Sequence, residues 1–200
     1  MKSLRLVLAS RSPQRSTLLD LLGIPYRVVV SEHDEDHHDG DPVRTVEENA
    51  RGKAEEVLGR VRLGAGELVL GVDTVVVHEG RVLGKAGGED EARSYLAALA
   101  GCRHEVFSGL HLCDGGGSFA GHVVTGVTFR PLAPADIDRY VASGEWRDRA
   151  GAYAIQGLGS ALVAAVDGDF FNVVGLPVPL LVEGLSAFGA PPLGWLTPPG

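Results

Sequence analysis

The segment LVLGVDTVVVHEGRVLGK, residues 68–85, decides the fold of this chain. Its β-branched and aliphatic residues are typical of a strand in the middle of a sheet. Asp73 lies near the centre of that strand with Thr74 beside it, and Glu79-Gly80 is predicted to form a turn before a second, short strand. We therefore expect a hairpin that brings Lys85 back towards Asp73.

A carboxylate inside an apolar strand needs a partner, because moving such an ion out of water costs on the order of several kcal/mol. An acid, a hydroxyl and an ammonium group that converge on two strands indicate a site for a phosphorylated ligand and its metal. The alternative is a structural salt bridge at Asp73. We favour a functional role, because unpaired acids are rare in the middle of a strand.

The composition limits the class of protein. Two hundred residues, of which 44% are hydrophobic, are enough for one substantial core. No apolar run reaches the ~20 residues that a bilayer span needs, so we expect a soluble, cytoplasmic protein without a membrane partner. A net charge of -8 disfavours a nucleic-acid partner, which requires a basic surface. Cys102 and Cys113 lack metal-site spacing, and we expect two reduced thiols.

Lysine and glutamine are both rare in this chain. Lysine occurs only at Lys2, Lys53 and Lys85, and glutamine only at Gln14 and Gln156. A compact ammonium group binds phosphate differently from a guanidinium, so the two internal lysines are candidates for anion binding. Chance is the alternative explanation of this pattern.

An anion-binding turn is predicted near the N-terminus. Residues 4–9 form a short apolar strand, and residues 10–15, SRSPQR, follow it directly. Ser12 can cap a helix whose first residue is Pro13. Free N–H groups at the helix start and the Arg15 guanidinium would attract phosphate, since an arginine in a first turn is otherwise unfavourable. A solvent-exposed Arg15 is the alternative.

The run SEHDEDHHDGD, residues 31–41, contains three histidines and six acids. These residues lack the fixed spacing of a metal site, so we expect a solvated loop. The acids nearest the preceding strand, Asp34 and Glu35, are kept as possible metal ligands.

A helix is predicted from Thr45 to about Leu58, because residues 45–48, TVEE, have the capping-box pattern. Its inward face consists of Val46, Ala50, Ala54 and Val57. Lys53 lies on the same face. Its side chain either extends to solvent or points into a cleft towards phosphate.

The remaining elements complete an α/β pattern. We expect strands over residues 26–30, 105–112, 121–129 and 161–166, and helices that begin at Glu89, Pro134 and Pro177. Strands and helices alternate at first and hairpins follow, which predicts one domain, residues 1–186, with a mixed, twisted sheet flanked by helices. Residues 187–200 are rich in proline and glycine and are predicted to be a mobile tail.

One familiar phosphate motif is excluded. Residues 80–86, GRVLGKA, resemble a P-loop but are one residue short. They also have alanine where serine or threonine would bind magnesium.

Seven segments, taken in order, resemble motifs of the Maf family of nucleoside triphosphate pyrophosphatases. They are LASRSPQRSTLLDLLG, Asp34-Glu35, the helix around Lys53-Ala54, GVDTVVVHEGRVLGK, LAGCRHEVFSGL, RAGAYAIQG and GDFFNVVGLP. The resemblance extends from about residue 4 to residue 182. It implies an elongated α/β fold similar to that of inosine triphosphate pyrophosphatases. It also implies cleavage of unwanted nucleotides to a monophosphate and pyrophosphate, and an association with inhibition of septum formation.

The resemblance also implies a role for individual residues. Asp73 would be the general base for the attacking water, and Glu35 with Asp73 would bind a divalent cation, Mg²⁺ or Mn²⁺. The groups that hold the phosphates would be Ser10, Arg15, Lys53 and Lys85. Members of the family are also expected to form homodimers.

Three positions bear on the choice of base. Thr74 and Gln156 match the branch of the family that prefers dTTP and UTP. Gln14 departs from that branch, which has the first arginine of a tandem pair there, and Arg149 stands where the family commonly has lysine. We predict a dTTP/UTP preference. The alternatives are the 7-methyl-GTP branch and a regulator of septum formation that binds nucleotides without hydrolysing them.

Overall fold

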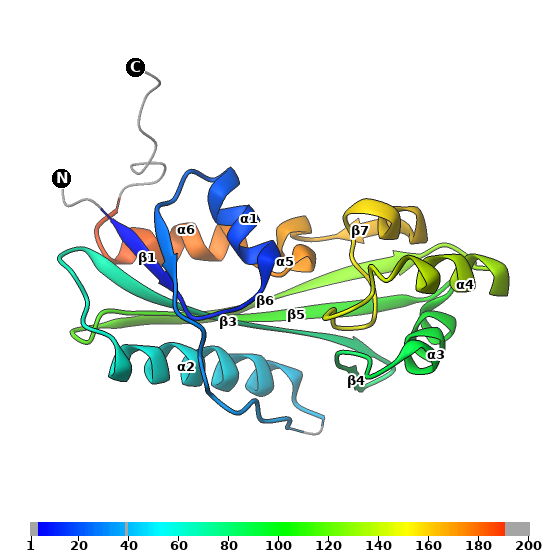
Figure 1. Cartoon of the computed structure of the whole chain (residues 1–200), viewed down its shortest axis with the longest axis horizontal. Coiled ribbons are helices and arrows are strands. Elements are labelled where there is room, and N and C mark those ends of the chain that lie inside the picture. Colours follow the sequence, from blue (N-terminus) through cyan, green and yellow to red (C-terminus); the bar gives the residue numbers. More distant parts are fainter. Residues whose placement is uncertain (1–3, 39, 191–200) are drawn as a thin grey trace, which may run out of the picture.

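A mixed, seven-stranded sheet runs along the long axis of the computed structural model, which describes residues 4–38 and 40–190 (Figure 1). The strands are β1 (Arg5–Leu8), β2 (Tyr26–Val28), β3 (Glu67–His78), β4 (Arg81–Leu83), β5 (Arg103–Cys113), β6 (Ser118–Phe129) and β7 (Val163–Asp167). Their order is β2-β1-β3-β5-β6-β7, and β4 also pairs with β3. β1 is parallel to β2 and β3, and the other pairs are antiparallel. The predicted α/β fold with a mixed sheet is confirmed.

Helices cover both faces of this sheet (Figure 1). On one face lie α1 (Pro13–Leu21), α5 (Phe170–Val174) and α6 (Val178–Ala187), and on the other lies α2 (Pro42–Arg60). α3 (Glu89–Leu99) and α4 (Pro134–Ser143) pack together at one end, and the 3-10 helix η1 (Gly157–Leu162) precedes β7. Within residues 4–38 and 40–190, none of the helices has the length and apolar character that a membrane span requires.

The alternation of side chains along β3 divides its residues between two cores. Leu70 and Val72 pack with α1 and α6, whereas Val69 packs with α2. Asp73 has the same phase as Val69 and therefore faces α2. Thr74 points to the opposite face, so the two polar neighbours are directed to different sides of the sheet.

The predicted hairpin is confirmed. Glu79 and Gly80 have φ angles of 49° and 74°, the left-handed values that a tight hairpin turn requires. Val76 pairs with Leu83 across the two strands. Lys85 follows two residues later and returns towards the middle of β3.

The start of α2 differs from the prediction. The helix begins at Pro42, not Thr45, and its cap is Asp41, whose carboxylate accepts a hydrogen bond from Arg44 N at 2.9 Å. Thr45 lies inside the first turn, where its hydroxyl donates to Asp41 O and accepts from His38 N. The capping-box prediction was wrong because Pro42 fixes an earlier first turn.

Other boundaries differ by a few residues. β2 ends at Val28, and the predicted strand over residues 161–166 begins only at Val163, after η1. Residues 170–174 form α5, which the sequence analysis did not assign. Helix α6 ends at Ala187, and residues 191–200 of the predicted tail lie outside the described residues.

Two glycines bring α2 unusually close to the sheet. A Cβ atom at Gly71 of β3 would collide with the carbonyl oxygen of Ala50, and one at Gly109 of β5 would collide with that of Val46. The helix backbone therefore rests directly on the strands. This close approach determines how deeply the side chains of α2 reach into the sheet.

We expect Gly109→Ala to lower the free energy of unfolding by about 2 kcal/mol, because the added methyl group must push α2 off the sheet. Urea unfolding followed by circular dichroism measures the effect. Gly59→Ala on α2 is the control, since open space surrounds Gly59, and this variant should be neutral or stabilised by up to about 1 kcal/mol. Equal effects of the two substitutions would contradict the close-packing argument.

Candidate active site

The edge of β3 is open around Asp73. β1 pairs with residues 67–70 of β3, and β4 pairs with residues 76–78 on the same edge. β5 occupies the other edge. In the described part of the chain, residues 71–75 therefore have no neighbouring strand on the β1 side. A ligand at this opening has access to both faces of the sheet.

Asp73 is buried at this opening, and both of its oxygens are engaged. Lys53 Nζ lies 2.6 Å from Asp73 Oδ1, and Asn49 Nδ2 donates to Asp73 Oδ2 at 3.2 Å. Lys53 Nζ also lies 2.6 Å from Glu35 Oε1. Two carboxylates thus share one buried ammonium group, and Lys53 points into the site instead of extending to solvent.

Glu35 reaches the site from the loop that follows β2. Burial raises the pKa of its carboxyl group, but Lys53, with weaker contributions from Lys85 and Arg15, lowers it more, so that the pKa lies below its ordinary value. Glu35 is therefore ionised at neutral pH. Asp34, the other acid kept from this run, is exposed and is not among the groups that bind Lys53.

Asn49 is a site residue that the sequence analysis missed. It is buried on α2, one helical turn before Lys53. Its amide oxygen accepts from Asp36 N and its amide nitrogen donates to Asp36 O, both at 2.9 Å, as well as to Asp73. The spacing of four residues from Lys53 was the available signal. Asn49 ties the loop that carries Glu35 to the buried acid.

Arg15 occupies the other face of β3. Its Nη1 donates to Ser10 Oγ at 2.8 Å, its Nη2 donates to Thr74 Oγ1 at 3.2 Å, and its Nε donates to Gly175 O at 2.9 Å. The side chain is buried, so the solvent-exposed alternative is wrong. Burial lowers the pKa of Arg15, while Asp73 and Glu35 raise it. The guanidinium stays protonated and faces a site with two nearby acids.

Ser108 is a second residue that sequence analysis missed. It is fully buried on β5, and its Oγ lies 2.9 Å from Thr74 Oγ1. The Thr74 hydroxyl is thus held between Ser108 and Arg15. A serine in the middle of an apolar strand gave no specific signal of this contact.

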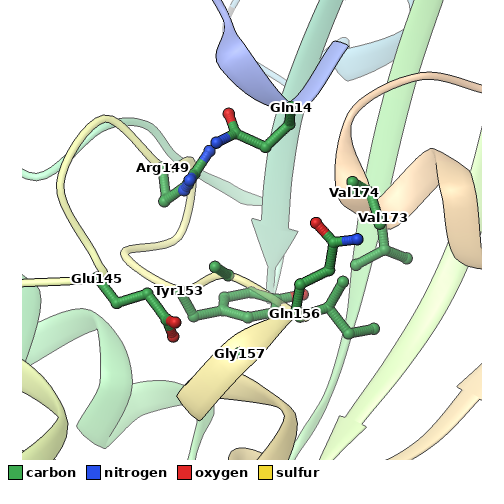
Figure 2. A pocket seen from close by; sticks show the side chains of 10 residues that line it. Gln14, Glu145, Arg149, Tyr153, Gln156, Gly157, Val173 and Val174 are labelled. Carbon is green, nitrogen blue, oxygen red and sulfur yellow. The ribbon is translucent and has the colours of Figure 1, made fainter. Parts of the chain in front are cut away.

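Gln14, Arg149 and Gln156 line one pocket beside this opening (Figure 2). Figure 2 shows the Gln14 and Arg149 side chains pointing towards each other, with the Gln156 amide nearer to Val173 and Val174 of α5. The other lining residues are Glu145, Tyr153, Ala154, Ile155 and Gly157. Amide groups beside apolar and aromatic walls suit a flat polar ring such as a nucleobase. Thr74 does not line this pocket.

The loop over residues 149–157 connects the pocket to the hairpin. Ala150 forms an isolated antiparallel bridge with Lys85, and Gly151 N donates to Leu83 O at 2.9 Å and to Gly84 O at 3.1 Å. Burial lowers the pKa of Arg149, and its Nε has no hydrogen-bond partner among the described residues. A buried donor of this kind is normally satisfied by a ligand or water.

The two acids suit a hard divalent cation. Mg²⁺ and Mn²⁺ prefer oxygen ligands, and Mg²⁺ is commonly bound by one or two carboxylates together with water and substrate phosphates. Glu35 and Asp73 converge on one point, where Lys53 now neutralises them. Within residues 4–38 and 40–190, no group of three or more His, Cys, Asp or Glu side chains is arranged to bind a metal. The oxygens of these two carboxylates, together with phosphate oxygens of a ligand, would suit such a cation.

The chain is similar to known proteins over nearly its whole length. The family model described as "Maf-like protein" matches residues 5–188. A dTTP/UTP pyrophosphatase from Anaeromyxobacter sp. (strain Fw109-5) is 48% identical over 202 residues, which cover 98% of this chain and 95% of the relative. The dTTP/UTP pyrophosphatases of Symbiobacterium thermophilum and Moorella thermoacetica are 45% and 46% identical, and the alignments cover 94% and 92% of this chain and 95% of each relative.

We expect Lys53→Met to lower the free energy of unfolding by about 3 kcal/mol at pH 7, because Asp73 and Glu35 lose their shared cation. Burial without that cation raises the pKa of a carboxyl group, so protonation relieves the cost and the loss should shrink between pH 7 and pH 5. Urea unfolding at several pH values measures both effects.

Lys85→Met is the matched control, since Lys85 is exposed. It should change the free energy of unfolding by no more than about 0.5 kcal/mol. If the two lysine variants lost stability equally at every pH, the proposed role of Lys53 as a counter-ion would be wrong.

Proposed function

The chain belongs to the Maf-like protein family, and from this premise we propose that it is a nucleoside triphosphate pyrophosphatase that prefers dTTP and UTP. The products would be a nucleoside monophosphate and pyrophosphate. The observation that carries the proposal is the buried Asp73 side chain, which pairs with Lys53 Nζ at 2.6 Å beside an opening surrounded by cations. The three relatives described above, which are named for this reaction and align with nearly the whole chain, support it.

The cations around the opening support the binding of a triphosphate. Arg15 uses three of its five N–H donors within the protein, which leaves two for phosphate oxygens. Lys53 and Lys85 supply ammonium groups from the other sides of the opening, and Ser10 supplies a hydroxyl. Because the chain as a whole carries a net charge of -8, a polyanionic substrate depends on these local cations.

In the proposed reaction Asp73 accepts a proton from a water molecule that attacks the α-phosphorus. The bond between that phosphorus and the oxygen bridging to the β-phosphorus breaks, and pyrophosphate leaves. Lys53 and Asn49 orient the carboxylate, so that one oxygen lone pair can face the water. Arg15 and Lys85 stabilise the charge that develops on the phosphate oxygens.

Glu35 and Asp73 are the residues that would bind a divalent cation, Mg²⁺ or Mn²⁺, in this mechanism. When bound, such a cation neutralises phosphate charge and makes the attacking water more acidic. Lys53 contacts both carboxylates with two of its three N–H donors, which leaves the third for a phosphate oxygen of the substrate.

Gln14 and Gln156 are the proposed contacts to the base. An amide offers one donor group and one acceptor, which matches the edge of uracil or thymine. Thr74, the third position that the sequence associates with specificity, holds Arg15 in this structure and would act on base choice through that contact. Arg149 supplies a positive charge close to Gln14, in the same pocket (Figure 2).

Two alternatives remain for experiment. One is the 7-methyl-GTP branch of the family, and the relatives named dTTP/UTP pyrophosphatase speak against it. The other is a nucleotide-binding regulator of septum formation without turnover. We further propose that the protein is cytoplasmic and forms a homodimer. Light scattering that detects only monomer would contradict the homodimer.

A product assay tests the function. The purified chain is incubated with dTTP, UTP, CTP, GTP or 7-methyl-GTP in Mg²⁺ or Mn²⁺, and monophosphate plus pyrophosphate are separated from diphosphate plus phosphate. We expect pyrophosphate, with dTTP and UTP turned over fastest. Release of inorganic phosphate, or binding without turnover, would contradict the proposal.

We expect Asp73→Asn to reduce pyrophosphate release by roughly a thousandfold, because the amide cannot accept the proton of the attacking water. Calorimetry with a non-hydrolysable α,β-imido analogue of UTP, without a divalent cation, should give an affinity within about threefold of the wild type, because the amide keeps the shape of the carboxylate; threefold corresponds to less than ~1 kcal/mol of binding energy. Asp20→Asn removes an exposed acid on α1 and serves as the control. Equal turnover in Asp73→Asn and the wild type would exclude Asp73 as the base.

A further inference from the structure

The loop that carries Gln156 has a strained backbone that the surrounding structure must hold. Gly151 and Ala152 are consecutive residues with φ angles of 67° and 57°, and Asp148 has 59°. A positive φ is unfavourable for an alanine, and Ala152 is fully buried. Such conformations persist where neighbouring contacts determine them, and they are concentrated at functional sites.

One set of contacts fixes the loop at Tyr153. The Tyr153 hydroxyl lies 2.9 Å from His104 Nε2 of β5, and both side chains are buried. The two rings also pack edge-on against Phe129 of β6, with centroid distances of 4.8 Å from Tyr153 and 5.0 Å from His104. Burial lowers the pKa of His104 to about 4, so the ring is neutral at physiological pH. Its Nδ1 has no hydrogen-bond partner among the described residues. Among those residues, Tyr153 therefore provides the one hydrogen bond to the His104 ring, at Nε2.

Further contacts fix the backbone on both sides of Gln156. Before it, Ala154 N donates to the buried Tyr140 hydroxyl at 3.0 Å. After it, the Glu145 carboxylate accepts from Leu158 N at 3.1 Å and from Gly159 N at 2.7 Å. Gln156 itself is exposed in the pocket. The position of its amide is therefore set by these contacts of Tyr153, Ala154, Leu158 and Gly159, which we call the frame of the loop.

His104 occupies a particular position in this frame. It lies in the sheet and does not line the pocket, whereas Tyr153 lines the pocket beside Gln156 (Figure 2). The hydrogen bond between His104 of the sheet and Tyr153 thus determines how far the loop lies from the sheet, three residues before Gln156. A shift of about 1 Å at a positioning contact is enough to change a specific interaction by large factors.

We propose that His104 is a positioning residue for base selection, which acts through its hydrogen bond to Tyr153 and so places the Gln156 amide. The inference rests on the proposed function in taking Gln156 as a contact to the base. It assigns selectivity to a residue of the sheet that touches neither the base nor the phosphates.

The test compares the affinity for non-hydrolysable α,β-imido analogues of UTP and GTP, measured by calorimetry, with kcat for UTP. We expect His104→Leu and Tyr153→Phe each to reduce the UTP over GTP affinity ratio about tenfold, while kcat for UTP falls less than about threefold. Because the two substitutions remove the same hydrogen bond, the double variant should lose no more selectivity than either single variant.

Two further variants separate positioning from a general loss of structure. His104→Gln places an amide near the position of Nε2 and should restore the ratio to within about threefold of the wild type. Tyr95→Phe removes a hydroxyl whose hydrogen bond goes to Glu91 on the same helix, α3, and should leave the ratio unchanged. If His104→Leu does not fold, Tyr153→Phe and His104→Gln carry the test.

The outcomes distinguish this proposal from the proposed function. An unchanged ratio in Tyr153→Phe with a lower melting temperature would assign a purely structural role to the pair and overturn the inference. Equal affinity of the wild type for the two analogues would also overturn it. If the wild type prefers the UTP analogue but releases no pyrophosphate, the pyrophosphatase proposal fails, while the positioning role is still decided by the ratio in the variants.

Discussion

The close contact between α2 and the sheet is the constraint on which the site depends. The helix backbone rests on β3 and β5 because Gly71 and Gly109 have no side chains, and this depth lets Lys53 Nζ reach within 2.6 Å of Asp73. A carboxylate in an apolar strand would otherwise be expelled or protonated. The pair of glycines and the ion pair therefore form one arrangement, in which packing geometry brings the Lys53 ammonium group to the buried Asp73 side chain.

A second consequence follows from how the strands share the edge of β3. β1 and β4 pair with its two ends and leave the middle open, at the place where the parallel part of the sheet ends. Ligands commonly bind at such changes in strand order. Neighbouring side chains of a strand point to opposite faces of the sheet. Asp73 therefore lies on one face, and Arg15, which bonds to Thr74, lies on the other. Under the proposed function, the opening would let one extended triphosphate reach both, and the base would be directed to the pocket of Gln14 and Gln156.

Local patterns predicted the elements and several of the site residues. The alternation in β3, the Glu79-Gly80 turn and the inward face of α2 depend on short-range rules, so they were read correctly, and Lys53 was placed on the right face. The predicted start of α2 was wrong because Asp41 and Pro42, and not Thr45, form the start of the helix. Asn49 and Ser108 were missed because their roles depend on partners on other elements, 24 and 34 residues away in sequence. Long-range contacts of this kind leave no local pattern.

In the proposed reaction, Asp73 directs a water molecule to the α-phosphorus of a nucleoside triphosphate. The most direct measurement is hydrolysis of UTP in water enriched in oxygen-18, with the label located by mass spectrometry. We expect the label to appear in the uridine monophosphate and the pyrophosphate to remain unlabelled. Label in the pyrophosphate would mean attack at the β-phosphorus, and the proposed placement of Asp73 relative to the substrate would then be wrong.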